Sequence, residues 1–295
     1  MSKRIAVIGS VNVDNVTYTK EPPTPGKTVF GESFVTNLGG KGANQVLAAQ
    51  FLGGDSIFFG AKGKDSNGDF ASTVLNSYGL KFYLKRVDAP TGVCNIIINT
   101  NTAENSIICV PGANQEITKE DVDFWMPKIK ECGMLICQLE VSIEASLYAL
   151  ERAKEEGLIT ILNPAPYHDF DKKNMVYLDY FIPNEHELDD FAGDFKGDAI
   201  EKAKLAMSYG CKNVIVTLGN KGSVLVNKDG VFNVKPHLVK AVDTTGAGDS
   251  YIGSFAKALM DGKTPVEAME FASYCSSLTV QKRGAIQSLP KLEDL

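Results

Sequence analysis

Residues Asp243–Met260 read Asp-Thr-Thr-Gly-Ala-Gly-Asp-Ser-Tyr-Ile-Gly-Ser-Phe-Ala-Lys-Ala-Leu-Met, a turn of small residues that runs into an apolar segment. This pattern predicts a helix over 250–260 that is preceded by Gly246, Ala247 and Gly248. Three small residues ahead of a helix expose successive backbone N–H groups, and the helix dipole adds partial positive charge. Such a turn can hold an anion, including the charge that develops on a phosphoryl group during its transfer.

Asp249 stands at the rim of this expected anion site. A carboxylate there can accept the proton of an attacking hydroxyl, as the base does in phosphoryl transfer. The alternative is structural: Asp249 is only the N-cap of the helix, and the glycines only form its turn. Taken alone, these residues leave both interpretations open.

A second glycine-rich segment, Asn37–Asn44, reads Asn-Leu-Gly-Gly-Lys-Gly-Ala-Asn and opens another expected helix. Glycines let a backbone lie against a ligand, and Lys41 and Asn44 offer donors to hydroxyl oxygens. Asp14, just past the first expected strand, can accept two hydrogen bonds from a vicinal diol. The alternatives are a plain glycine turn with a solvated Lys41, and a turn aspartate at Asp14.

Short apolar runs alternate with amphipathic segments along the chain, which predicts a largely parallel sheet between helices. In such sheets, ligands bind beyond the carboxyl ends of the strands. Two β-rich stretches, about 15–36 and 93–110, break the alternation and predict a small secondary sheet. The segments with the clearest patterns are strands at 5–8, 56–60, 134–139, 159–162, 180–182 and 214–218, a hairpin around 228–230, and helices at 68–78, 143–156, 199–209 and after the N-cap Thr264.

The composition bounds the class of protein. The chain has 295 residues, 44% hydrophobic and 22% charged, which is typical of globular proteins, and no linker divides it, so we expect a single domain over 1–295. There are 36 acidic and 30 basic residues without a basic stripe, which argues against a nucleic-acid partner. No run reaches the ~20 apolar residues of a membrane span, and the N-terminus lacks a signal sequence, so we expect a cytoplasmic protein.

Several common motifs are absent or incomplete. Gly26-Lys27-Thr28 resembles the end of a P-loop, but Glu21 stands where that motif needs its first glycine. No G-x-G-x-x-G follows the first expected strand, which argues against a nicotinamide-dependent oxidoreductase. The six cysteines show neither a C-x-x-C motif nor zinc spacing, and we expect buried free thiols in a reducing compartment.

The segments Gly39–Asn44 and Asp243–Asp249, in this order and at this separation, resemble the two signatures of the ribokinase-like (PfkB) family of carbohydrate kinases. The resemblance covers essentially the whole chain, and the form Gly-Gly-Lys-Gly-Ala-Asn favours the ribokinase branch. It implies a central, mostly parallel sheet flanked by helices, with the small sheet as a lid over the sugar. It also implies an ATP-dependent kinase that phosphorylates the 5-hydroxyl of D-ribose to give D-ribose 5-phosphate and ADP, with Mg²⁺ and K⁺ as cofactors and a homodimer formed through the lid.

The resemblance also implies roles for individual residues. Asp249 would be the catalytic base, and Gly246, Ala247 and Gly248 would form the anion hole. The sugar-binding residues would be Asn12, Val13, Asp14, Gly40, Lys41, Gly42, Ala43, Asn44, Glu140 and Asp249. The ATP-binding residues would be Asn184, Thr217, Leu218, Gly219, Asn220, Lys221, Gly222, Gly248 and Ser273. The metal-binding residues would be Glu187 for Mg²⁺, and Asp243, Thr245, Thr279, Lys282, Gly284 and Ser288 for K⁺.

Alternatives remain at this stage. Glu187 by itself is more typical of the solvated start of an acidic helix. The substrate could be 2-deoxyribose or a nucleoside, and a non-catalytic sugar-binding regulator is the alternative outside the enzymes. A carboxylate at Asp249 beside an intact anion hole argues against the regulator, because a binding module has no need of a base. His168, His186 and His237 match no catalytic position of the family and are interpreted as structural or solvated.

Overall fold

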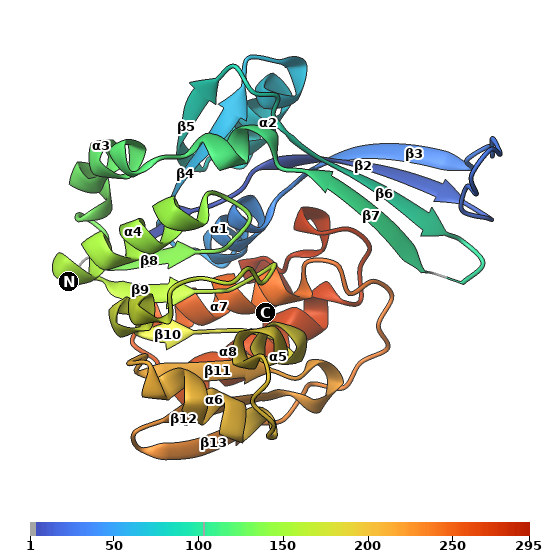
Figure 1. Ribbon diagram of the computed structural model, residues 1–295. Helices are drawn as coiled ribbons and strands as arrows, with labels where there is room; N and C mark the ends of the chain where they lie inside the picture. Colours follow the sequence, from blue (N-terminus) through green and yellow to red (C-terminus); the bar gives the residue numbers. More distant parts are fainter. Residues whose placement is uncertain (1–3, 103) are drawn as a thin grey trace.

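The structure is a computed structural model that describes residues 4–102 and 104–295. A nine-stranded main sheet forms its centre, and a four-stranded small sheet projects from one side (Figure 1). The prediction of an α/β fold with a mostly parallel central sheet, flanking helices and a separate small sheet is confirmed.

The main sheet has the strand order β13-β12-β11-β10-β9-β8-β1-β4-β5. All neighbouring strands pair in parallel except at one edge, where β12 pairs antiparallel with both β11 and β13. Every residue of β1 and β8 is buried, as expected for central strands that are covered on both faces. The strands are β1 (Ile5–Ile8), β4 (Ser56–Gly63), β5 (Lys81–Val87), β8 (Met134–Cys137), β9 (Ile159–Leu162), β10 (Tyr180–Phe181), β11 (Asn213–Thr217), β12 (Ser223–Asn227) and β13 (Gly230–Val234).

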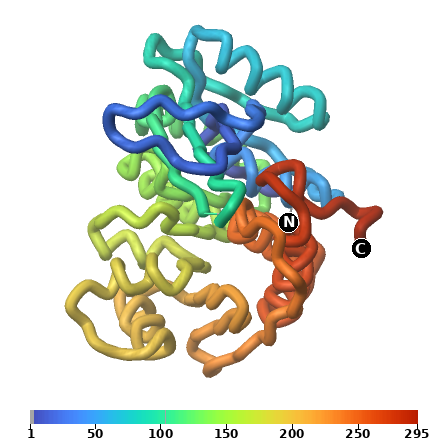
Figure 2. Tube along the Cα trace, turned by 90° about the vertical axis from the view of Figure 1, so that its right-hand side faces the viewer, coloured from blue at the N-terminus to red at the C-terminus, as the bar shows by residue number. Residues whose placement is uncertain are grey.

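Helices cover both faces of the main sheet and enclose two apolar cores. Because side chains alternate along a strand, Ala6 and Ile8 of β1 enter one core and Ile5 and Val7 enter the other. Figure 2 shows α7 and α8, orange to red, on the opposite side of the sheet from the yellow α5 and α6. One face carries α3 (Lys119–Ile129), α4 (Ile143–Glu155), α5 (Glu185–Ala192) and α6 (Ala199–Ser208), and the other carries α1 (Lys41–Phe51), α2 (Ser66–Ser77), α7 (Ala247–Met260) and α8 (Pro265–Thr279).

The small sheet has the order β3-β2-β6-β7, with β2 and β6 parallel and the other pairs antiparallel. Its strands are β2 (Asn12–Thr19), β3 (Ser33–Gly39), β6 (Gly92–Asn99) and β7 (Asn105–Val110). It leaves the main sheet just after β1, so the residues at the start of β2 lie where the two sheets meet. Within the described ranges, no helix has the length and apolarity needed to cross a membrane.

Some elements differ from the sequence-based expectation. The helix predicted over 250–260 begins at Ala247, because Gly246 adopts a left-handed conformation and serves as its N-cap. Asn12 and Asp14 lie on β2 rather than in a loop. Helix α3 was not predicted, although its Thr118–Asp121 capping box is visible in the sequence. The predicted N-cap Thr264, with Pro265 in the first turn of α8, is confirmed.

The prediction of free thiols is wrong for two of the six cysteines. Cys94 on β6 and Cys109 on β7 are directly opposite each other, with Cα atoms 4.1 Å apart, and form a disulfide. Their separation of 15 residues carries no recognisable spacing, because the pairing depends on the register of two antiparallel strands. The remaining cysteines are buried free thiols as predicted, and burial raises the pKa of Cys132 and of Cys275 to about 11.

Candidate active site

The loop at the start of α7 presents a helix N-terminus to solvent. Gly246 has φ 77°, and a Cβ placed there would lie 3.1 Å from the Cα of Ala285, so both conformation and packing require glycine. A Cβ at Gly248 would meet no atom within 4 Å, so the protein's own packing does not require this glycine. The first turn of an α-helix leaves N–H groups without intrahelical acceptors, and here it faces open space in which an anion can lie.

Asp249 lies in this first turn, but it does not cap the helix, because the N-cap is Gly246. The capping interpretation of Asp249 is therefore wrong. Its side chain is only 7% exposed. The Nδ2 of Asn44 donates to its Oδ2 at 2.8 Å, and the Nε2 of Gln45 donates to its Oδ1 at 2.9 Å. Consecutive residues of α1 thus hold both carboxylate oxygens.

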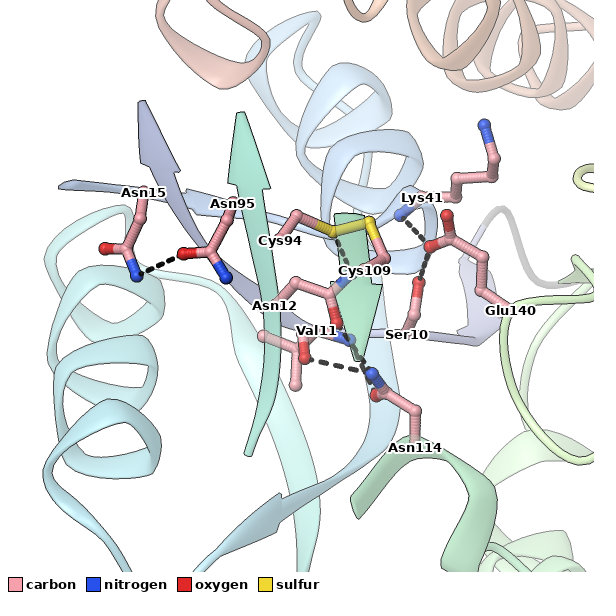
Figure 3. Close-up of a disulfide and its surroundings, with 10 residues drawn as sticks. All are labelled: Ser10, Val11, Asn12, Asn15, Lys41, Cys94, Asn95, Cys109, Asn114 and Glu140. Atoms are coloured by element: carbon pink, nitrogen blue, oxygen red, sulfur yellow. Dashed lines mark hydrogen bonds between the residues drawn. A yellow bond between two sulfur atoms is a disulfide. The ribbon is translucent and has the colours of Figure 1, made fainter. Parts of the chain in front are cut away.

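A second carboxylate, Glu140, follows β8 and faces the start of α1 (Figure 3). Its Oε2 accepts hydrogen bonds from the Oγ of Ser10 at 2.5 Å and from the backbone N–H of Lys41 at 3.0 Å. Nearby, the Oδ1 of Asn12 accepts a hydrogen bond from the Nδ2 of Asn114 at 2.7 Å. These side chains and their partners come from four separate segments, which meet where the two sheets join.

The electrostatics of this region are dominated by closely spaced carboxylates. Burial, together with the charges of Glu140 and Asp249, raises the pKa of Asp14 to about 7. Burial alone would lower the pKa of the Lys41 ammonium, but neighbouring carboxylates outweigh it and raise this pKa above its ordinary value. Near pH 7 the Asp14 carboxyl is partly ionised and the Lys41 ammonium is charged, so this region offers both acceptors and donors of hydrogen bonds to hydroxyl groups.

The glycines of the Gly39–Gly42 turn are explained by packing. A Cβ on Gly39 would lie 2.1 Å from the Oδ2 of Asp14, and one on Gly40 would lie 2.8 Å from the carbonyl oxygen of Ser10. A Cβ on Gly42 would lie 2.6 Å from the carbonyl carbon of Gly9. The glycines thus let the start of α1 press against the β1–β2 connection, which brings Lys41 and Asn44 to the site.

Two cavities meet at the loop before α7. The cavity beside the small sheet has a volume of about 420 Å³ and is lined by Asp14, Asp243 and Thr245. The other has a volume of about 310 Å³ and is lined by Ala247, Gly248 and Ser273. Thr244 lines both cavities, so the loop 243–248 forms the partition between them.

Most of the residues that the resemblance assigned to ATP line the smaller cavity, namely Thr217, Gly219, Asn220, Gly222, Gly248 and Ser273. Leu218 instead packs against a core, and the Nζ of Lys221 pairs with Glu185 at 3.1 Å. His237 and Tyr251 also line this cavity. Sequence reasoning assigned neither of them to it, because the loop that carries His237 has no periodic pattern.

Of the remaining residues, Val13 and Ala43 are buried and line neither of these two cavities. Asn184 caps α5, and both oxygens of Glu187 accept hydrogen bonds from it at 2.9 Å. Burial raises the pKa of Glu187. The backbone N–H of Asn184 and the charge of Lys41 act in the opposite direction but do not outweigh burial. Glu187 is therefore a capping residue that also interacts electrostatically with Lys41 and Asp249, rather than a purely solvated residue.

The residues expected to hold metals contain oxygen donors that suit hard cations. Each carboxylate oxygen of Glu187 keeps a second lone pair, which fits contact with Mg²⁺ through water. Asp243 accepts hydrogen bonds from the N–H groups of Thr245 and Gly284, both at 2.9 Å, and so draws two segments of the expected K⁺ site together. Lys282 donates its N–H to the carbonyl of Thr279 at 3.1 Å, and the Ser288 hydroxyl donates to Ala285 at 2.7 Å. Among the residues that the structure describes, no group of three or more His, Cys, Asp or Glu could hold a metal by itself.

Comparison with known proteins agrees with this architecture. The model of the pfkB family carbohydrate kinases matches residues 2–292. The chain is 36% identical to the deoxyribokinase of Salmonella typhi over 98% of this chain and 96% of that protein. It is also similar to the solved ribokinase of Thermotoga maritima (TM-score 0.90, 36% identity, covering 98% of this chain and 97% of that one). The Arabidopsis thaliana ribokinase complexed with ribose and ATP has a TM-score of 0.89 and 28% identity, covering 100% of this chain and 97% of that one. The chain belongs to the pfkB family of carbohydrate kinases.

Proposed function

We propose that this chain is an ATP-dependent ribose kinase, which transfers the γ-phosphoryl group of ATP to the 5-hydroxyl of D-ribose and releases D-ribose 5-phosphate and ADP. The observation that carries the proposal is the loop 243–248, which separates two cavities and ends at a buried carboxylate. The larger cavity, whose mixed lining includes the polar residues Asp14, Asn37 and Asp243, would take the sugar, and the smaller would take the nucleotide. The phosphoryl group would then cross at the loop itself.

Each residue of the site has a role in this reaction. Asp14, Lys41, Asn44 and Glu140 bind the sugar hydroxyls, together with Asn12. Asp249 accepts the proton of the 5-hydroxyl as that oxygen attacks phosphorus. The N–H groups at the start of α7 stabilise the charge that develops on the transferring group, which the open space at Gly248 lets approach. The small sheet would exclude water, which competes with the sugar as acceptor.

Two metal ions complete the proposal. Mg²⁺ would neutralise phosphate charge, with Glu187 and Asn184 on its protein side. K⁺ would lie beside the loop 243–248 and help to order it, held by Asp243, Thr245 and Gly284 together with Thr279, Lys282 and Ser288. Their oxygen-rich composition supports both sites.

We also propose a homodimer formed through the small sheet. Its outer strands β3 and β7 present exposed apolar side chains, including Phe34 (62% exposed) and Ile108 (68% exposed). Exposed apolar edge strands favour pairing with another copy. Sedimentation of wild type and of an Ile108→Lys variant would test this, since the variant should lose the dimer.

For the compartment we propose the cytoplasm, where ATP is available. The Cys94–Cys109 disulfide would then be one of the uncommon ones in a reducing environment. Alkylating the thiols of freshly lysed cells and counting the modified cysteines by mass spectrometry would establish its state there.

The test of the reaction is release of ADP from magnesium-ATP with ribose, 2-deoxyribose, fructose or adenosine as acceptor, each with and without K⁺. A preference for ribose supports the proposal, and stimulation by K⁺ supports the cation site. A preference for 2-deoxyribose would support the second candidate, a deoxyribokinase, to which the chain is as similar (36% identity) as it is to the ribokinase of Thermotoga maritima. ADP release with none of the four would contradict a sugar kinase and favour a sugar-binding regulator.

A further inference from the structure

A chain of buried amide side chains lies directly behind Asp249. The Nε2 of Gln45 donates to the Oδ1 of Asp249 at 2.9 Å and also to the Oδ1 of Asn163 at 3.0 Å. The Oε1 of Gln45 accepts a hydrogen bond from the Nε2 of Gln138 at 2.7 Å. The Nδ2 of Asn163 donates to the carbonyl of Ile182 at 2.9 Å. The amides therefore connect Asp249 to the carboxyl ends of three strands.

These amides belong to the interior and not to the walls of the substrate site. Gln45 and Gln138 are 0% exposed and Asn163 is 8% exposed, and none of them lines either cavity. Burying three amides is costly, above all where a group stays unpaired, and the Oε1 of Gln138 has no hydrogen-bond partner among the described residues, so the arrangement needs a reason beyond packing. A Cβ on Gly9 would lie 2.1 Å from the Oε1 of Gln138, so the chain also depends on a missing side chain in the β1–β2 connection.

The hydrogen bonds determine which way the Gln45 amide faces. Its NH₂ group has two protons, and both are used, one by Asp249 and one by Asn163. Reversing the amide would set its oxygen against two acceptors and its NH₂ group against the NH₂ group of Gln138. The partners therefore fix Gln45 as a donor to Asp249.

We propose that Gln45 is a positioning residue for phosphoryl transfer and that Gln138 and Asn163 hold it in its donating orientation. The inference rests on the proposed function of Asp249 as the base. Gln45 holds Oδ1 from behind while Asn44 holds Oδ2, which fixes the plane of the carboxylate. Neutral amides achieve this without adding a positive charge that would weaken Asp249 as a proton acceptor.

The test compares Gln45→Met with wild type in two independent measurements. Gln45→Met keeps the length of the side chain but removes the donor. We expect kcat to fall about 10- to 100-fold, as is typical when the hydrogen-bonding partner of a functional group is lost. The KM values for ribose and ATP should stay within about threefold, because binding groups are untouched. Gln138→Met, which removes only the group that orients Gln45, should shift kcat in the same direction by less.

Thr160→Val is the matched control, because it removes a buried hydroxyl, bonded to the carbonyl of Tyr177 at 2.6 Å, from a strand of the same sheet without touching the amide chain. It should lower thermal stability but leave kcat unchanged. The second measurement is a crystal structure of Gln45→Met, in which the Asp249 carboxylate should leave its wild-type orientation. An unchanged kcat in both glutamine variants, or an unmoved carboxylate, would overturn the inference. If wild type releases no ADP with any sugar but the carboxylate moves in Gln45→Met, the proposed function fails, and what stands is that Gln45 orients the Asp249 carboxylate.

Discussion

The raised pKa of Asp14 makes sugar binding depend on pH in the physiological range. Burial and the charges of Glu140 and Asp249 raise this pKa to about 7, so the carboxyl changes its protonation between pH 6 and pH 8. An ionised Asp14 can accept two hydrogen bonds from a vicinal diol, whereas the protonated form must donate one. We therefore expect ribose to bind the ionised form, and its affinity to rise as pH rises.

The size of the effect follows from the fraction of binding-competent protein. With a pKa of about 7, the ionised fraction of Asp14 is roughly 0.09 at pH 6 and roughly 0.91 at pH 8. The apparent Kd equals the intrinsic Kd divided by this ionised fraction. The Kd for ribose should therefore fall about tenfold between these pH values, which corresponds to about 1.4 kcal/mol. Binding at pH 7 should also release about half a proton per sugar.

Isothermal titration calorimetry of ribose without ATP, in two buffers of different ionisation enthalpy, measures both quantities. Asp14→Asn should bind weakly with little pH dependence. Glu140→Gln should move the midpoint to lower pH, because it removes a charge that raises the pKa of Asp14. A Kd that stays constant from pH 6 to pH 8, with no proton release, would contradict the prediction that ribose binds the ionised form of Asp14.

Stability should respond to the same group with the opposite sign. Asp14 binds its proton more tightly in the native than in the unfolded chain, since its native pKa of about 7 exceeds the ordinary 3.8. The contribution of Asp14 to the stability of the ligand-free protein therefore becomes less favourable as pH rises from about 4 to about 7. Asp14→Asn should melt at a higher temperature than wild type, by a margin that grows between pH 5 and pH 8. A margin that shrinks over this range would contradict the raised pKa.

Asp249→Asn should lower turnover by about 10²–10⁴-fold, the usual contribution of a general base, with ribose affinity nearly unchanged in calorimetry; normal turnover would remove Asp249 from the chemistry. Lys41→Ala should mainly raise the Kd for ribose, and an effect confined to ATP would place Lys41 outside the sugar site. Gly248→Ala should lower turnover while the melting temperature does not fall, because no protein atom lies within 4 Å of the added Cβ; equal losses of both would indicate a structural role. Reduction should expose the thiol of Cys109 to alkylation without unfolding the protein, as mass spectrometry and circular dichroism would report, whereas Cys94, which is 6% exposed, should react more slowly; labelling of Cys109 that requires denaturant would contradict its exposed position on β7.

Local features of the fold could be predicted because their causes are local. The Thr264-Pro265 start of α8 and the buried run of β1 depend on residues that are neighbours in sequence. Helix α3 carried signals of the same kind, since Val122, Trp125 and Met126 follow helical spacing after a capping residue. That helix was missed, although its pattern was present.

The alternating α/β fold and, through two signature segments, the family and the residue types of the site follow from the amino-acid sequence. How these residues act depends on the contacts that the folded chain makes. Asn44 and Gln45 donate hydrogen bonds to Asp249, which lies 205 and 204 positions further along the chain. Cys94 lies opposite Cys109 because of the register in which β6 and β7 pair. Hydrogen-bond partners, the pKa of a buried carboxyl and the pairing of cysteines all depend on which distant segments lie side by side and exclude water. Local sequence patterns do not encode that proximity, because it arises only when the strands assemble into sheets.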